Sequence, residues 1–130
     1  MKHTEHFNFE KLDVWTKAVE FADKILDLVE NIETERKHYR LFEQIESAAT
    51  SVSMNIAEGK GRFSKKEFVH FLYISRGSLF ESVTLLTVFE KRYWITKDCL
   101  EKLKEEAVLI GKMLNSLINK IKYQEPTTKS

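Results

Sequence analysis

Apolar residues recur at alternating steps of three and four along most of the chain, a spacing that places side chains on one side of an α-helix. The repeat occupies four stretches, which polar or glycine-containing connections separate. It predicts helices over about residues 12–32, 39–59, 64–94 and 97–122. Between these stretches the sequence does not alternate with the period of two that is typical of a β-strand.

The third and fourth stretches carry the most regular apolar stripes. In the third, the stripe consists of Phe68, Leu72, Ser75, Leu79, Ser82, Leu86, Phe89 and Tyr93, with Phe80 beside it. In the fourth, it consists of Leu100, Leu103, Ala107, Ile110, Leu114, Leu117 and Ile121. Amphipathic helices joined by short connections bury such stripes against one another, which predicts an all-α fold, an antiparallel up-down-up-down four-helix bundle. A coiled-coil dimer is the alternative, and the turn before residue 64 disfavours it.

Local signals mark where the helices begin and end. Gly59 and Gly61 follow the second apolar stripe, and a glycine in the left-handed conformation closes a helix well. The run from Ser64 to Glu67 matches a capping box, in which the serine hydroxyl accepts from a free amide at the helix start and the glutamate carboxylate reaches back to the serine amide. Thr96 is a candidate N-cap for the last helix.

Small residues on the second and third helices predict a close approach between them. Pairing these helices about Gly61 places Ala48 opposite Ser75, and Ile45 opposite Ser78. A close approach of the two backbones would explain why Gly77 is kept inside a helix, where glycine costs about 1 kcal/mol relative to alanine.

Length and composition place the chain among compact soluble domains. Its 130 residues suit one domain, which we expect over residues 1–123 with a flexible tail over 124–130. A formal charge of +1 excludes a polybasic protein. A single cysteine, the lack of a signal-like start and the lack of an apolar span predict a cytoplasmic protein with no membrane segment.

Charge is distributed unevenly along the sequence. Residues 1–35 hold four Lys and nine acidic residues, whereas residues 36–130 hold 17 basic and 11 acidic residues. The up-down topology gathers the basic residues at the two ends of the bundle, where they would contact phosphates. The candidate nucleic-acid contacts are Arg36, Lys37, Arg40, Lys60, Arg62, Lys65, Lys66, Lys91 and Arg92. Lys97, Lys120 and Lys122 lie nearby, and solvated helix connections rich in Lys and Arg are the simpler interpretation.

Residues suited to catalysis or metal binding do not form a recognisable motif. His3, His6, His38 and His70 lack the helical spacing of metal ligands. Cys99 lies in a first helical turn with no histidine near it in sequence, so a buried or half-buried thiol is expected. We therefore predict no enzyme, no cofactor and no metal. Trp94, beside Lys91 and Arg92, is the best candidate for an aromatic platform that stacks on a base.

Three segments together resemble a known family. They are Leu12–Ala18, the run from Asn55 to Gly59 with Arg62, and Phe71–Glu81. Over about residues 9–122 the chain resembles the four-helix bundle family encoded in intervening sequences of bacterial 23S ribosomal RNA genes, which is related to the accessory variability protein of diversity-generating retroelements. The resemblance implies architectural roles for the matching motif residues Asn55, Glu58, Gly59, Gly77, Ser78 and Glu81.

The resemblance also implies a function class. It implies assembly into a homopentamer, no enzymatic activity and, as in the retroelement relatives, binding to nucleic acid and to a reverse transcriptase. An acidic face on one helix and basic ends elsewhere would allow copies to associate in a ring. We expect an oligomeric bundle whose basic ends contact structured RNA or a ribonucleoprotein. A protein-interaction module without nucleic-acid binding is the alternative, and an enzyme using Cys99 or His70 is a remote third.

Overall fold

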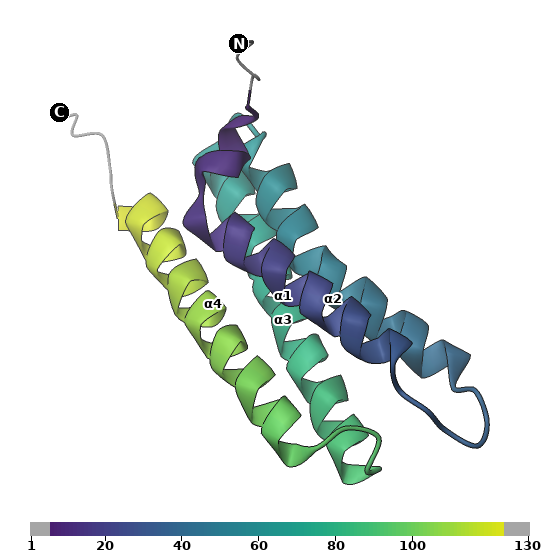
Figure 1. The fold of residues 1–130 in the computed structure, drawn as a ribbon. Coiled ribbons are helices and arrows are strands. Elements are labelled where there is room, and N and C mark those ends of the chain that lie inside the picture. The colour runs from purple at the N-terminus through teal and green to yellow at the C-terminus, as the bar shows by residue number, and fades with distance from the viewer. Residues whose placement is uncertain (1–5, 124–130) are drawn as a thin grey trace, which may run out of the picture.

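The computed structural model describes residues 6–123, which form a short 3₁₀-helix and four α-helices (Figure 1). The elements are η1 (Asn8–Lys11), α1 (Asp13–Glu30), α2 (Tyr39–Lys60), α3 (Lys65–Lys91) and α4 (Lys97–Tyr123). No strand occurs within this described range. The predicted all-α class is confirmed, and the helices begin and end close to the predicted positions. The tail predicted over 124–130 lies outside the described residues.

Consecutive helices run in opposite directions and pack side by side, and α4 closes the bundle against α1 (Figure 1). Within residues 6–123, the Cα atoms of the diagonal pairs, α1 with α3 and α2 with α4, do not come within 8 Å of each other. The arrangement is the predicted up-down-up-down bundle. It places the α1–α2 and α3–α4 connections at one end, and the α2–α3 turn at the other end together with η1 and the last turn of α4.

The apolar stripes meet in a core that runs the length of the bundle. Its largest fully buried side chains include Phe21, Ile45, Leu72, Phe89 and Leu114, which come from all four helices. Burial of such side chains is the main favourable term in folding. The prediction that the apolar stripes form the core is therefore confirmed.

The seven-residue spacing overestimates how long the α4 stripe stays buried. The stripe is buried from Leu100 to Leu114, but Leu117 and Ile121 are half-buried and Ile118 is only 2% exposed. A straight helix has 3.6 residues per turn, so a strict seven-residue stripe drifts around it. In α3 the last predicted stripe residue, Tyr93, is 92% exposed because the helix ends at Lys91.

The register between α2 and α3 differs from the predicted one. The buried Ser75 hydroxyl donates to the carbonyl oxygen of Val52 at 2.7 Å, and the Ser78 hydroxyl donates to the Ser51 hydroxyl at 2.9 Å. The predicted partner of Ser75, Ala48, lies about one helical turn before Val52, and the predicted partner of Ser78, Ile45, lies between one and two turns before Ser51. The difference arises because the connection continues to Ser64, so the centre of the turn lies beyond Gly61.

Two of the glycine predictions are wrong. Gly61 is the C-cap of α2 with φ −82°, and no glycine among the described residues has a positive φ. The close approach of α2 and α3 occurs at Gly59, where an added Cβ would lie 2.7 Å from the Cβ of Phe71. A Cβ on Gly77 would meet nothing within 4 Å. Glycine is therefore required by packing at position 59, and no contact within the chain requires it at position 77.

Both predicted N-caps are confirmed, but the other half of the predicted capping box is not: among the described residues, the Glu67 carboxylate does not accept from the Ser64 amide. The Ser64 hydroxyl accepts from the backbone amide of Glu67 at 3.0 Å, and the Thr96 hydroxyl accepts from the amide of Cys99 at 3.0 Å. Each satisfies a backbone amide that has no partner within its helix.

Candidate nucleic-acid interface

The two helix connections at one end of the bundle meet around Trp94. The Trp94 ring lies 4.4 Å from the ring of His38 and 5.8 Å from that of Phe42, measured between centroids. We call this region, residues 33–43 and 90–98, the Trp94 end. The contact brings the predicted cluster of Arg36, Lys37 and Arg40 to the same end as Lys91 and Arg92. All five of these side chains are exposed. Trp94 is half-buried by its neighbours. It therefore acts mainly as a packing residue and offers only part of its ring to a base.

The α3 helix ends at this region in a Schellman motif. The Trp94 amide donates to the Phe89 carbonyl at 2.9 Å, and the Tyr93 amide donates to the Glu90 carbonyl at 2.9 Å. The Trp94 and Phe89 rings lie 5.2 Å apart, which supplies the apolar contact typical of the motif. Tyr93 occupies the left-handed position with φ 63°, a conformation that favours glycine. The Tyr93 side chain therefore points into solvent from a constrained backbone.

At the opposite end, the α2–α3 turn is held by several short contacts. The Gly61 amide donates to the Ala57 carbonyl at 3.3 Å, and the Arg62 amide donates to the Gly59 carbonyl at 3.0 Å. The Arg62 guanidinium forms an ion pair with Glu58 at 2.7 Å and lies 4.7 Å from the centre of the Phe71 ring. These contacts fix the path of the chain between the two helices.

Basic side chains from three segments gather at this end. Lys65 and Lys66, at the start of α3, line a pocket of about 380 Å³ with Lys122 from α4. Lys120 lines a neighbouring pocket with Asp13. Lys60 is half-buried, and its ammonium lies 5.6 Å from the centre of the Phe68 ring. We call this region, residues 6–13, 58–67 and 118–123, the Phe63 end.

The two ends differ in how far acidic side chains offset the basic ones. The Trp94 end holds six basic and five acidic residues, including Glu33, Glu35 and Glu43. The Phe63 end holds seven basic and four acidic residues. A phosphate backbone is attracted by a local surplus of cations. The Phe63 end therefore offers the stronger electrostatic surface of the two.

Phe63 was not singled out in the sequence, yet among residues 6–123 it is the most exposed large apolar side chain. Its exposed fraction is 108%, and it lies between Arg62 and the helix cap Ser64. Phe7 and Tyr123, at the same end, are 67% and 75% exposed. An aromatic residue inside a turn, with no apolar partner at helical spacing, is the sequence signal that would have identified it.

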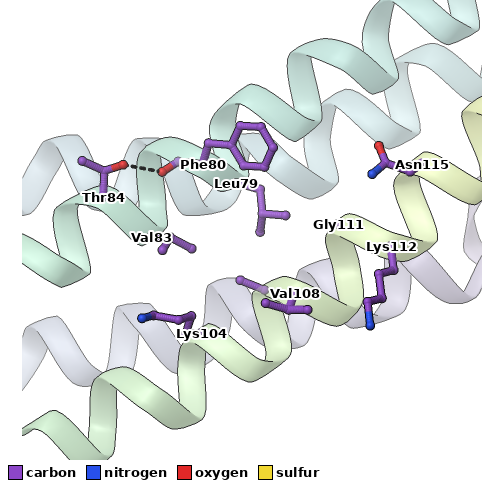
Figure 2. A pocket seen from close by; sticks show the side chains of 10 residues that line it. Leu79, Phe80, Val83, Thr84, Lys104, Val108, Gly111, Lys112 and Asn115 are labelled. Carbon is purple, nitrogen blue, oxygen red and sulfur yellow. Dashed lines mark hydrogen bonds between the residues drawn. The ribbon is translucent and has the colours of Figure 1, made fainter.

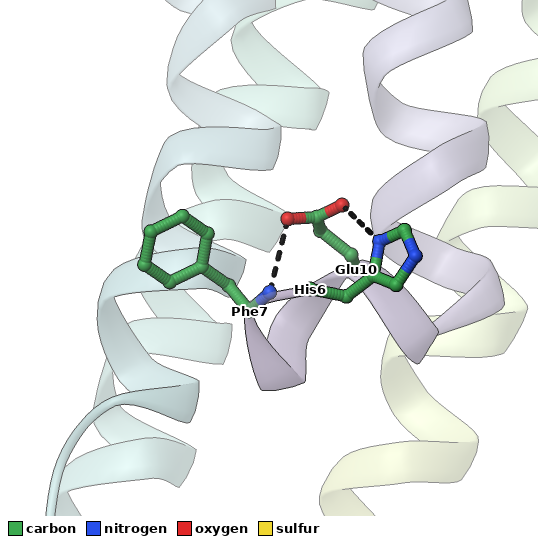
Figure 3. A network of polar contacts seen from close by, with 3 residues as sticks. All are labelled: His6, Phe7 and Glu10. Atoms are coloured by element: carbon green, nitrogen blue, oxygen red, sulfur yellow. Dashed lines mark hydrogen bonds and ion pairs between the residues drawn. The ribbon is translucent and has the colours of Figure 1, made fainter. Parts of the chain in front are cut away.

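A short polar network joins His6, Phe7 and Glu10 at the Phe63 end (Figure 3). The Glu10 carboxylate accepts from the Phe7 amide at 3.1 Å and lies 3.2 Å from Nδ1 of His6. The hydrogen bond from the Phe7 amide, followed by the contact with His6, lowers the pKa of Glu10 below its ordinary value. This network stabilises η1 next to α2.

Five of the six motif residues make contacts that hold α2 and α3 in place. Asn55 Nδ2 donates to both the carbonyl and the hydroxyl oxygen of Ser51 at 2.8 Å, and Ser51 is also the acceptor for Ser78. The Glu81 carboxylate accepts from Gln44 Nε2 at 3.1 Å. With the Glu58–Arg62 pair and the packing at position 59, these contacts explain an architectural role. They leave Gly77 without an explanation inside the chain.

The residues considered for catalysis are not assembled into a site. Within residues 6–123, His, Cys, Asp and Glu side chains do not form a group of three that could hold a metal ion, and His3 lies outside the described residues. His70 is exposed on α3. Burial of the half-buried Cys99 thiol, reinforced by the nearby charge of Asp98, raises its pKa above the ordinary value. A raised pKa disfavours the reactive thiolate.

A second surface feature is an apolar groove of about 520 Å³ between α3 and α4 (Figure 2). Leu79 and Val83 form its floor, and Phe80 and Val108, which are 58% and 50% exposed, stand at its rim. Phe80 is therefore not the core residue that its place beside the α3 stripe suggested. Exposed apolar surface of this kind is typical of protein contacts.

The fold and these surfaces define a class: a small helical bundle whose ends, and above all the Phe63 end, carry clustered cations. The profile of the 23S rRNA-intervening sequence protein family matches residues 10–116, and the chain belongs to this family.

A crystal structure from Bacteroides thetaiotaomicron is similar to the chain, with a TM-score of 0.75 and 28% sequence identity. The similarity covers 81% of this chain and 97% of that one, which is described as a protein of unknown function from the S23 ribosomal protein family. No curated protein sequence matches the chain. Over the described residues, none of the helices has the length and apolar character needed to cross a membrane.

Proposed function

We propose that this protein is a non-enzymatic, oligomeric bundle that binds structured RNA through its basic ends, with the Phe63 end making the larger contribution. The observation that carries the proposal is the convergence of Lys65 and Lys66 from α3 with Lys122 from α4 on one small surface. Phosphates bind such clusters, and the affinity falls steeply with salt. Membership of a family of rRNA-intervening sequence proteins favours RNA as the nucleic acid.

RNA contact by the nine predicted residues stays a proposal, and the exposure of most of them supports it. Eight of them are exposed, and Lys60 is the half-buried exception. At the Trp94 end, the side chains of Arg36, Lys37, Arg40, Lys91 and Arg92 make no ion pair with any described residue, so they are available to a ligand.

Oligomerisation would raise the overall affinity for RNA, because each copy of the chain adds another Phe63 end. We propose a homo-oligomer, with the pentamer that the resemblance implied, in which several Phe63 ends act together on one RNA. Repeated binding surfaces raise avidity without new contacts at each site. A light-scattering measurement of mass in solution tests this part, and a monomer at all concentrations would overturn it.

The RNA proposal is tested by anisotropy of a fluorescein-labelled RNA hairpin titrated over a range of salt concentrations. One variant replaces Lys60, Arg62, Lys65 and Lys66 with Ala, and the matched variant replaces Arg36, Lys37, Lys91 and Arg92. Each phosphate contact removed lowers the slope of log affinity against log salt by roughly 0.7–0.9. We expect the first variant to lose more slope than the second. Absence of binding at low salt, or unchanged binding by both variants, would reject the proposal.

A protein-interaction module is the second candidate, and the groove beside Phe80 and Val108 is the observation that favours it. Protein captured by the purified chain after nuclease treatment, and lost in Phe80→Ser, would support this candidate. Nucleic acid that copurifies with the chain and is removed by salt would support the first. The cytoplasmic location and the reverse-transcriptase partner stay predictions, and a binding assay with the purified reverse transcriptase tests the latter.

A further inference from the structure

Phe63 has an environment that differs from that of the other exposed aromatic residues at its end of the bundle. The Phe7 ring stacks on that of Phe9 at 5.5 Å, and the Tyr123 ring lies 5.9 Å from the Lys122 ammonium. Phe63 makes no comparable ring contact among the described residues, and its exposed fraction is 108%. Its whole ring surface is therefore open to a ligand, although water is an unfavourable environment for it.

The backbone that carries this ring is constrained. Gly61 on one side is hydrogen-bonded to Ala57, and Ser64 on the other caps α3 through the amide of Glu67. The neighbouring Arg62 side chain is held between Glu58 and the Phe71 ring. Because the turn is fixed before binding, little conformational entropy is lost when the ring meets a partner.

Three cations lie near Phe63 in the sequence or at the same end of the bundle. Arg62 precedes Phe63, Lys66 follows it by three residues in the first turn of α3, and Lys122 lines a small pocket together with Lys66. An open aromatic face bordered by cations is the arrangement with which proteins hold unpaired nucleotides: the ring stacks on the base and the cations bind the phosphates.

We propose that Phe63 stacks on an unpaired base of the bound RNA while Arg62, Lys66 and Lys122 contact the neighbouring phosphates. This inference rests on the proposed RNA binding and adds to it a preference for loops and bulges over uninterrupted duplex. A base inside a duplex is already stacked on both faces, so a paired segment engages the cations alone.

Two other partners for the ring are less well supported. Anchoring to a membrane surface needs a broad apolar face, whereas the turn offers one ring among cations. A symmetric contact between two copies through this turn would bring two cationic surfaces together, which repel each other.

The test compares two fluorescein-labelled RNAs: a hairpin with an unpaired loop, and a fully paired duplex of matched length. The variants are Phe63→Ala, the conservative Phe63→Trp, and Phe80→Ala as a matched control, since Phe80 is 58% exposed in the middle of α3, away from both basic ends. A circular dichroism spectrum checks that each variant folds, which we expect because neither side chain is buried.

We expect Phe63→Ala to weaken binding to the loop RNA by about 5- to 150-fold, the range for loss of one stacked base. Its salt slope and its affinity for the duplex should not change, because the phosphate contacts are intact. Phe63→Trp should retain loop affinity, and Phe80→Ala should bind both RNAs as the parent protein does.

Three results would overturn the inference. If the parent protein binds the loop RNA and Phe63→Ala binds it equally well, the stacking role is wrong while the proposed RNA binding stands. If the parent protein binds neither RNA at low salt, both proposals fail. If Phe63→Ala keeps its loop affinity but loses cosedimentation with phosphatidylserine vesicles, or changes the mass measured in solution, the ring belongs to a membrane or subunit contact instead.

Discussion

Replacing Gly59 with Ala tests the geometry of the close contact that this residue makes between α2 and α3. The new Cβ would lie 2.7 Å from the Cβ of Phe71, 3.0 Å from Cδ1 of Phe68 and 3.2 Å from the Phe68 carbonyl oxygen, whereas ordinary contacts begin at 3.4 Å. The first and third of these atoms are tied to the α3 backbone and cannot rotate away. The two helices must therefore move apart near the turn.

The expected loss follows from two opposing terms. Overpacking costs about 1–3 kcal/mol. Alanine gains about 1 kcal/mol over glycine inside a helix. We therefore expect the free energy of unfolding to fall by up to about 2 kcal/mol, which for a chain of this size lowers Tm by up to roughly 8 °C. Urea unfolding followed by circular dichroism measures it, and an unchanged m-value shows that the unfolded state is the same.

Gly77→Ala is the matched control, because it makes the same change in the neighbouring helix with nothing within 4 Å of the new Cβ. This variant should be more stable by about 0.5–1 kcal/mol. If Gly59→Ala were at least as stable as the parent protein, the close approach at Gly59 would be wrong. If Gly77→Ala were destabilised, another surface would have to pack against Gly77 in solution.

Two further predictions concern single side chains. Tyr93→Gly should raise the free energy of unfolding by about 1 kcal/mol, because glycine occupies the left-handed position at φ 63° without strain. A thermal melt measures the gain. Tyr93→Ala, which keeps a Cβ, should show no such gain. The raised pKa of Cys99 should make the folded thiol react more slowly with a disulfide reagent than the urea-unfolded thiol does near pH 9, and equal rates would contradict it. The stability that the protonated thiol contributes is complete below the ordinary pKa of 9.0 and is lost as the pH rises through the higher folded value, a dependence that Cys99→Ser should abolish.

The sequence predicted the parts of this fold that depend on local chemistry. Helical spacing of apolar residues identified all four helices, and the hydroxyls of Ser64 and Thr96 identified two helix starts, because capping involves residues only three positions apart. The gathering of the two connections at one end followed from antiparallel topology, and the contact between His38 and Trp94 bears it out.

Tertiary structure decided what depends on the distance between helices. The sequence suggested that Gly77 allows a close approach, but packing places that approach at Gly59, since the length of the turn sets which residues face each other. In the same way, the sequence pattern did not distinguish the two basic ends by their net charge, and it did not identify Phe63 as an exposed residue. Antiparallel topology placed Lys122 at the same end as Lys66, and the folded chain shows that the two line one pocket. Only the folded chain shows that the Phe63 ring is uncovered, because the exposure of a side chain depends on which distant segments pack against it.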